Sequence, residues 1–152
     1  MEKRCMVAGC FVIEKGKVLL LHHTKIGLWL PPGGHLEENE FPNEAAIRET
    51  KEETGLDVEL LCNDAIMHTD TQSHTLEVPF TIIYEHVPYK TEPPHIHFDM
   101  SYVAKVRGGI LNSNKESDDI GWFDSKELER LETLPSVRNI ALEVLRQYGN
   151  KL

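Results

Sequence analysis

The hydrophobic residues of this chain fall mostly into short runs and alternating patterns, separated by polar or glycine-containing breaks. Such patterns are typical of β-strands. We expect strands over residues 5–13, 18–22, 58–62, 80–86, 97–106 and 120–123. The segment 14–17 between the first two strands predicts a hairpin. The Pro-Pro-Gly-Gly segment 31–34 and the proline-bearing segment 88–94 predict loops, because proline and glycine interrupt regular structure.

Two segments have helical patterns. The first covers residues 43–54, with Pro42 suited to its first turn and Gly55 to the position just past its end. In the second, apolar residues recur at helical spacing from Val137 to Tyr148, which predicts a stripe packed against the sheet. The length of 152 residues fits one domain. We therefore predict a single α+β domain over residues 1–152, in which helices cover a sheet.

Charge and composition narrow the possible partners. The chain has 25 acidic and 16 basic residues, which leaves a net charge of −9. Binding to nucleic acid depends largely on lysine and arginine, so we expect no nucleic-acid partner, and a polyanionic substrate would need metal ions or local cations. The longest apolar run, residues 18–21, is far too short to span a membrane. The absence of a signal-peptide pattern and the scattered cysteines predict a cytoplasmic protein.

Three glutamates of the first predicted helix, Glu49, Glu52 and Glu53, fall on one face, because residues three and four apart are neighbours on a helix. Smaller or apolar side chains fall on a different face suited to packing, namely Ala46, Ile47, Thr50 and Thr54. Clustered carboxylates repel one another, and the helix dipole adds to this repulsion near the C-terminal end. A hard cation such as Mg²⁺ would stabilise the cluster, since it prefers carboxylate oxygens. The alternative interpretation is a solvated face with ordinary ion pairs.

This helix and the glycine-rich segment before it resemble the Nudix box, the signature of the Nudix (MutT-like) hydrolase family. In that pattern a glycine is followed at fixed distances by a glutamate and then by an Arg-Glu-x-x-Glu-Glu-x-Gly string. The matching positions are Gly34, Glu40, Arg48, Glu49, Glu52, Glu53, Gly55 and Leu56. Thr50 stands where an aliphatic residue is usual, and we expect this difference to affect packing slightly and the chemistry not at all.

The resemblance implies the Nudix fold, a mixed sheet between helices, and hydrolysis of a nucleoside diphosphate linked to another group X. The reaction would use Mg²⁺ or Mn²⁺ and a metal-activated water that attacks phosphorus in a small-molecule nucleotide. By resemblance, Glu49, Glu52 and Glu53 would be metal ligands. The carbonyl of Gly33 could supply a further oxygen, because glycine allows close approach of the backbone.

The remaining roles also follow from the resemblance. Arg48 would orient a ligand glutamate through a charge-assisted pair, and Glu40 would support the geometry between loop and helix. The general base is either Glu53 or Glu116, which precedes the Trp-Phe strand. Glu116 could equally belong to an acidic surface loop.

Several polar residues outside the box are further candidates. His95, His97 and Asp99 alternate with apolar residues and therefore point to one side of a strand. That face could bind a transition metal, touch substrate phosphate, or be a polar face outside the core. His35 could face either the phosphates or solvent. A polar stretch further along the chain could form a loop over the site; it contains His68, Asp70 and His74.

Two other functions are known for related folds. The domain could bind a nucleotide as a sensor without hydrolysing it, or it could resemble the isomerase branch, which uses a catalytic cysteine and a degenerate box. The intact box favours hydrolysis over both. Gln72 and His74 stand near the positions where members acting on ADP-ribose or dinucleoside polyphosphates carry a proline or tyrosine, so neither subgroup is supported. The strand edges are compatible with a homodimer.

Overall fold

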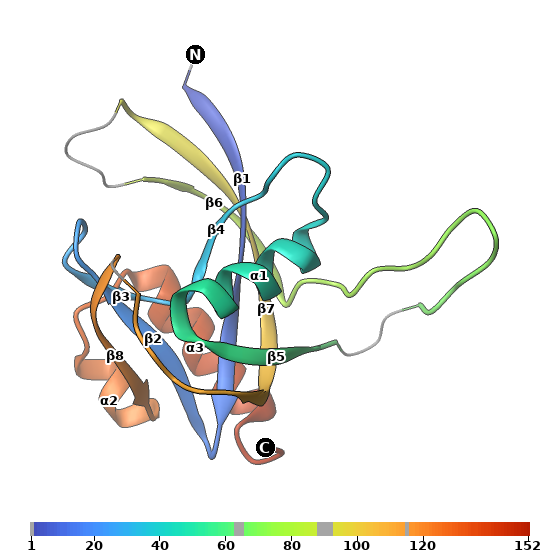
Figure 1. The fold of residues 1–152 in the computed structure, drawn as a ribbon. Coiled ribbons are helices and arrows are strands. Elements are labelled where there is room, and N and C mark those ends of the chain that lie inside the picture. The colour runs from blue at the N-terminus through green and yellow to red at the C-terminus, as the bar shows by residue number, and fades with distance from the viewer. Residues whose placement is uncertain (1, 63–65, 88–92, 115) are drawn as a thin grey trace.

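The computed structural model describes residues 2–62, 66–87, 93–114 and 116–152. The strands are β1 (Lys3–Glu14), β2 (Lys17–His23), β3 (Leu28–Leu30), β4 (Gly33–His35), β5 (Leu56–Leu61), β6 (Thr81–His86), β7 (His95–Gly109) and β8 (Ser117–Phe123). The helices are α1 (Pro42–Thr54), α2 (Ser125–Arg130) and α3 (Pro135–Tyr148). Figure 1 shows their arrangement, with β1 running through the middle of the molecule.

The strands form a mixed sheet with the order β3-β2-β1-β7-β5, to which β4, β6 and β8 are added at β1, β7 and β2. The long central strands β1 and β7 are parallel, and every other pairing among the described strands is antiparallel. β1 changes partner along its length: residues 7–9 pair with β4, whereas residues 13–14 pair with β2. Along this edge of β1 the sheet therefore separates into β4 and β2, and the candidate site lies between these two strands.

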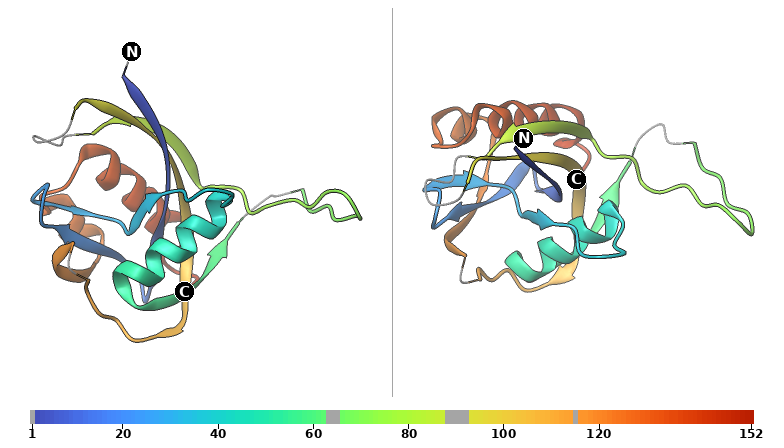
Figure 2. Two further views of the ribbon diagram at one scale, coloured as in Figure 1. Left: turned by 45° about the horizontal axis from the view of Figure 1, so that its top comes forward. Right: turned by 90° about the horizontal axis from the view of Figure 1, so that it is seen from above.

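Helices cover the two faces of the sheet. The α1 side buries a core cluster in which Ala45 and Ala46 pack with Cys10 of β1. The α3 side buries a second cluster in which Val137 and Val144 pack with β1 and β2. Figure 2 shows the sheet between the two helices, which confirms the predicted α+β architecture. The predicted apolar stripe of the C-terminal helix is also confirmed, because it packs against the sheet.

Some predicted boundaries were wrong. The segment 31–34 is not entirely a loop, since Gly33 and Gly34 belong to β4 and pair with Gly9 and Ala8. Ile47 was expected to pack but is 37% exposed. The short elements β3 and α2 were not predicted, although Asp124 and Glu127 form a recognisable capping box before α2. Most of the predicted loop 88–94 lies outside the described residues.

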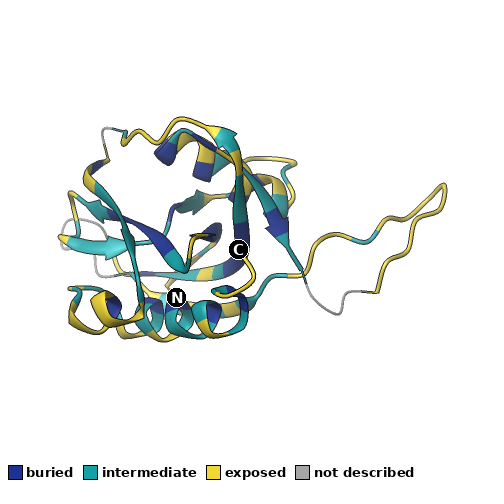
Figure 3. Ribbon diagram, turned by 90° about the horizontal axis from the view of Figure 1, so that it is seen from below, coloured by how far each residue is buried: buried dark blue, intermediate teal, exposed yellow. Residues whose placement is uncertain are grey.

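Residues 66–79 form an arm that extends away from the body of the molecule (Figure 1), and most of the arm is exposed (Figure 3). A single bridge joins Thr69 and His74 near its tip. His68 and Asp70 form an ion pair of 2.8 Å on the arm itself. The sequence left open whether this stretch forms a loop over the site, and none of His68, Asp70 and His74 lines the cleft at the candidate site. No helix in the described ranges is long and apolar enough to cross a membrane.

Candidate active site

The helix α1 positions the box glutamates, and both of its ends are defined by local chemistry. At its start, the Phe41 backbone N–H donates to the Glu44 carboxylate over 2.9 Å, and Pro42 occupies the first turn. At its end, Gly55 has φ of 77° and its N–H donates to the Lys51 carbonyl over 2.9 Å. This left-handed conformation favours glycine and stops the helix directly after the glutamates.

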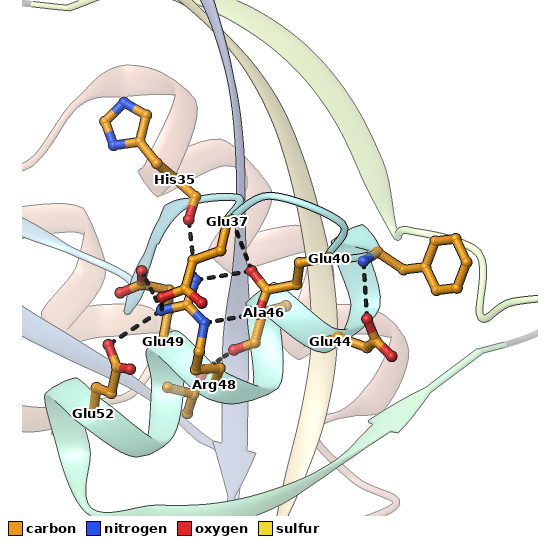
Figure 4. A network of polar contacts seen from close by, with 10 residues as sticks. His35, Glu37, Glu40, Glu44, Ala46, Arg48, Glu49 and Glu52 are labelled. Atoms are coloured by element: carbon orange, nitrogen blue, oxygen red, sulfur yellow. Dashed lines mark hydrogen bonds and ion pairs between the residues drawn. The ribbon is translucent and has the colours of Figure 1, made fainter.

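Arg48 is the centre of a network that ties the loop before α1 to the helix (Figure 4). Its guanidinium donates to both carboxylate oxygens of Glu40, over 2.7 and 2.9 Å. It also donates to Glu49 over 2.9 Å, to Glu52 over 3.2 Å and to the His35 carbonyl over 3.1 Å. These hydrogen bonds lower the pKa of Glu40. Arg48 thus links the loop that carries Glu40 to the helix that carries Glu49 and Glu52.

Glu53 is the most buried of the box glutamates, with 7% of its surface exposed. Its carboxylate accepts a hydrogen bond of 2.9 Å from the Gly33 N–H. Burial raises the pKa of Glu53 to about 8, and the negative charges of Glu49, Glu116 and Glu52 add to this effect. Burial likewise raises the pKa of Glu49. The site thus concentrates acidic side chains whose mutual repulsion a cation would relieve.

The two glycines of β4 allow a close approach that no other residue would permit. A Cβ atom on Gly34 would lie 2.5 Å from Cδ of Glu49. A Cβ atom on Gly33 would lie 2.9 Å from the Ala8 carbonyl oxygen. Glycine at these positions lets the Glu49 carboxylate lie directly against β4, while β4 lies against β1.

The chemistry of the donors fits a hard divalent cation, because carboxylate oxygens are its preferred ligands. Glu49, Glu52 and Glu53 come from two successive turns of α1, and Gly33 lies against Glu53. Within the described ranges, no three histidine, cysteine or acidic side chains already converge on one point as a metal centre. Arg48 donates to one carboxylate oxygen of Glu49 and to one of Glu52, so the second oxygen of each carboxylate could bind a cation while Arg48 holds the first.

A cleft of about 580 Å³ brings the candidate residues together. One end holds the box, and its lining there includes Gly33, Gly34, Glu49, Glu52, Glu53 and Glu116. Glu116 is exposed to solvent, yet it lines the cleft and contributes to the raised pKa of Glu53. The Glu116 carbonyl accepts hydrogen bonds from the backbone and hydroxyl of Thr24, which hold this segment against the turn after β2.

The other end of the cleft is formed by β6 and β7. His97 and Asp99 line it, whereas His95 is buried with 9% exposure and its Nδ1 lies 3.0 Å from the Pro93 carbonyl. His35 also lines the cleft, and its ring lies 5.2 Å from that of His97. The sequence reasoning missed Glu85, which lies beside Asp99 in the same lining. The sequence contains no signal for Glu85, because residues 81–86 do not alternate between apolar and polar side chains; the pairing of β6 with β7 places it beside Asp99.

A mixed sheet thus lies between helices, and an Arg-linked row of glutamates lines a cleft. The family profile of the NUDIX domain matches residues 3–147, and the chain belongs to this family of Nudix hydrolases. An uncharacterised Nudix hydrolase of Bacillus subtilis is 42% identical over 146 residues, which cover 94% of this chain and 80% of that protein.

Solved structures agree with this assignment. A NUDIX-family hydrolase from Clostridium perfringens is 30% identical and superposes with a TM-score of 0.78 over 95% of this chain and 98% of that one. A MutT protein from Methanosarcina mazei shares the fold with a TM-score of 0.70 at 18% identity, over 100% of this chain and 99% of that one. The predicted family and fold are confirmed.

Proposed function

We propose that the protein is a Mg²⁺- or Mn²⁺-dependent pyrophosphohydrolase that cleaves a phosphoanhydride in a nucleoside diphosphate linked to a group X. The observation that carries this proposal is the buried Glu53, which lies against Gly33 at one end of a cleft that Glu49, Glu52 and Glu116 also line. Three acidic side chains around one buried carboxylate suit cations that offset the charge of a polyphosphate.

In this proposal Glu49, Glu52 and Glu53 hold the metal, with an oxygen from the Gly33 carbonyl. When bound, the metal neutralises phosphate oxygens and lowers the pKa of water. Arg48 keeps Glu49 and Glu52 in position, since it donates to both carboxylates. The remaining role is to accept a proton from the attacking water.

Two glutamates are candidates for that base. Glu53 is the most buried of the box glutamates and lies against Gly33 in the cleft, so its carboxylate is placed to accept a proton where the metal would bind. Glu116 also lines the cleft and is exposed, and its carbonyl accepts hydrogen bonds from Thr24, which leaves its side chain available to reach substrate. A Glu116→Gln variant distinguishes them: unchanged turnover at saturating metal would remove Glu116 from the mechanism.

The test of the proposed function is release of phosphate and pyrophosphate from a nucleotide panel with Mg²⁺ and Mn²⁺. The panel covers nucleoside triphosphates, oxidised guanine nucleotides, ADP-ribose, nucleotide sugars and dinucleoside polyphosphates. We expect turnover that EDTA abolishes and that a Glu53→Gln variant lacks. Saturable nucleotide binding without any turnover would instead favour the sensor function.

A further inference from the structure

The end of the cleft away from the box contains two neighbouring carboxyl groups, those of Glu85 and Asp99. On the antiparallel strands β6 and β7, Ile83 lies opposite Asp99 and Glu85 lies opposite His97. Glu85 and Asp99 are therefore diagonal neighbours on one face, and both line the cleft. The two carboxyl groups are close enough for each to shift the pKa of the other. Two neighbouring carboxylates repel each other, which favours a proton on one of them.

The surroundings keep that proton on the pair. Burial, followed by the negative charge of Asp99, raises the pKa of Glu85 to about 7. Burial also raises the pKa of Asp99, although the Ser101 hydroxyl donates to its carboxylate over 3.2 Å. Burial and mutual repulsion thus favour retention of a proton on the pair as pH approaches neutrality, and the pair offers acceptor oxygens to a ligand.

The position of the pair in the sheet separates it from the phosphate end. His35 of β4 pairs with Val7 of β1, and Val7 pairs with Asp99 of β7. Since neighbouring strands lie about 4.8 Å apart, Asp99 is roughly 10 Å across the sheet from β4, and Glu85 is one strand further. A substrate with its phosphates at Glu49 and the other box glutamates would extend its remaining part toward this pair.

This end of the cleft does not suit phosphate. Burial, together with the positive charges that His35 and His95 would carry, lowers the pKa of His97 to about 4, so its ring is neutral. The charge at this end is therefore that of Glu85 and Asp99, which repels anions. A neutral group that donates hydrogen bonds fits here instead.

Two further observations indicate a ligand at this end. Nε2 of His97 is buried and has no hydrogen-bond partner among the residues that the structure describes, which is costly unless a ligand or water supplies one. In addition, apolar side chains contribute to the cleft lining and could contact a flat or ring-shaped group, namely Leu30, Ile83, Leu134, Val137 and Ile140. The combination is that of a ligand pocket, mostly apolar with a few polar groups that fix orientation.

We propose that Glu85 and Asp99 form a specificity subsite for the phosphate-free end of the substrate, where they accept hydrogen bonds from two adjacent N–H or O–H donors. A nucleobase edge and a sugar diol both present such donors. This inference rests on the proposed function, because it assumes that the phosphates occupy the box end. It makes Glu85 and Asp99 determinants of selectivity that do not take part in the chemical step.

The test uses four nucleotides that differ by single donors: GTP, ITP, dGTP and dITP. GTP and ITP differ by the base amino group, and GTP and dGTP differ by a ribose hydroxyl. Phosphate and pyrophosphate release with Mg²⁺ gives kcat and KM for the wild type and for Glu85→Gln and Asp99→Asn variants. Glu14→Gln is a matched control, because Glu14 is exposed at the far end of β1.

We expect the wild type to prefer the nucleotide that carries the donor by about 10- to 100-fold in kcat/KM, as for one hydrogen bond to a charged group. A preference for GTP over ITP would identify the base as the group bound at the subsite, and a preference for GTP over dGTP would identify the sugar. Both variants should reduce that preference mainly through KM, and Glu14→Gln should retain it. Equal preferences in the wild type and both variants would overturn the proposal. If Asp99→Asn failed to fold, Glu85→Gln would carry the test.

A failure of the proposed function is distinguishable from a failure of the subsite. If the wild type released no phosphate or pyrophosphate from any nucleotide, the proposed function would be wrong. Equilibrium binding of the same four nucleotides in EDTA would then still report on the subsite. A donor preference in binding that Glu85→Gln removes would support it, and indifferent or absent binding would overturn it.

Discussion

The backbone N–H of Gly33 donates to the buried carboxylate of Glu53 over 2.9 Å, and this contact joins β4 to the last turn of α1. The contact couples β4 to α1, and both residues line the cleft. Because a buried carboxylate is costly without partners, the contact also favours one orientation of the Glu53 side chain. The geometry of the candidate metal site thus depends on the sheet as well as on the helix.

A Glu53→Gln substitution should separate chemistry from stability. The amide oxygen of glutamine can still accept from Gly33, and no buried charge remains, so we expect an unchanged or higher melting temperature. Turnover should fall by about 10²- to 10⁴-fold, because both a metal ligand and a candidate base are lost. Turnover assays and thermal melts of the purified variant check both parts. Turnover within twofold of the wild type would exclude Glu53 from catalysis.

A Gly34→Ala substitution should displace the Glu49 carboxylate. The new Cβ would lie 2.5 Å from Cδ of Glu49, which is the far end of a flexible side chain and can move away. We therefore expect a small loss of stability, about 1 kcal/mol or less, but at least a tenfold lower apparent affinity for Mg²⁺. Mg²⁺ titrations of turnover and thermal melts measure these effects.

Gly108→Ala is the matched control for this prediction, since its Cβ would contact only Asp57 at 3.8 Å. A Gly34→Ala variant with the same Mg²⁺ dependence as Gly108→Ala would show that Glu49 does not bind the metal. Gly9→Ala gives a contrasting case, because its Cβ would lie 2.4 Å from the Pro32 backbone carbonyl oxygen. Backbone cannot yield as a side chain can, so that variant should lose stability.

The ion pair between Arg48 and Glu40 should contribute measurably to stability. Only 22% and 12% of the two side chains are exposed, and two hydrogen bonds of 2.7 and 2.9 Å join them. A double-mutant cycle with Arg48→Ala and Glu40→Ala should give a coupling energy of about 1–2 kcal/mol by urea denaturation. If the effects of the two substitutions on the free energy of unfolding were strictly additive, the ion pair would contribute no coupling energy to the folded state.

Divalent metal should stabilise the folded protein even without substrate. At a Mg²⁺ concentration about 100-fold above its dissociation constant, binding adds about 2.7 kcal/mol, which corresponds to roughly 5–10 °C in melting temperature. Glu52→Gln should lose most of this shift, while Glu14→Gln should keep it. The Glu52 side chain is 54% exposed, so its removal should leave the metal-free melting temperature nearly unchanged. An equal shift in both variants would exclude Glu52 as a ligand.

The Glu85–Asp99 pair should make the stability of the folded protein depend on pH. Since the pKa of Glu85 is raised from 4.5 to about 7, the folded state binds more protons between these values, and the free energy of unfolding falls as pH rises through them. Glu85→Gln removes this dependence. We expect the melting temperature of the variant relative to the wild type to increase by a few degrees from pH 5 to 7.5, on the order of 1 kcal/mol after solvent screening.

Neighbouring groups have opposite effects, so the comparison must be between variant and wild type at each pH. The pKa of His97 is lowered from 6.5 to about 4, so the unfolded state binds more protons between these values. The free energy of unfolding that neutral His97 contributes is therefore lost as pH falls from 6.5 toward 4. Asp99 acts on Glu85, whereas His35 and His95 act on His97, and all of these groups remain in the variant. A constant difference between the two proteins across this pH range would show that Glu85 does not share a proton with Asp99.

The sequence by itself determined the parts of this protein that depend on short-range geometry. Glu49, Glu52 and Glu53 share a region of α1 because helical neighbours are three and four residues apart, and Gly55 ends the helix because its backbone is left-handed. The family resemblance followed from the same spacing. These features need no knowledge of how distant segments pack.

Only the tertiary structure decided which distant segments meet. β4 forms because Gly33 and Gly34 can lie directly against β1, a contact that a Pro-Pro-Gly-Gly string does not reveal. Glu85 joins Asp99 through the register of β6 and β7, and Glu116 reaches the cleft through its contacts with Thr24. Pairing between strands is non-local, since a shift of one residue turns every side chain to the other face. The helix was therefore predictable from the sequence, whereas the strand pairing that brings Glu85 beside Asp99 was not.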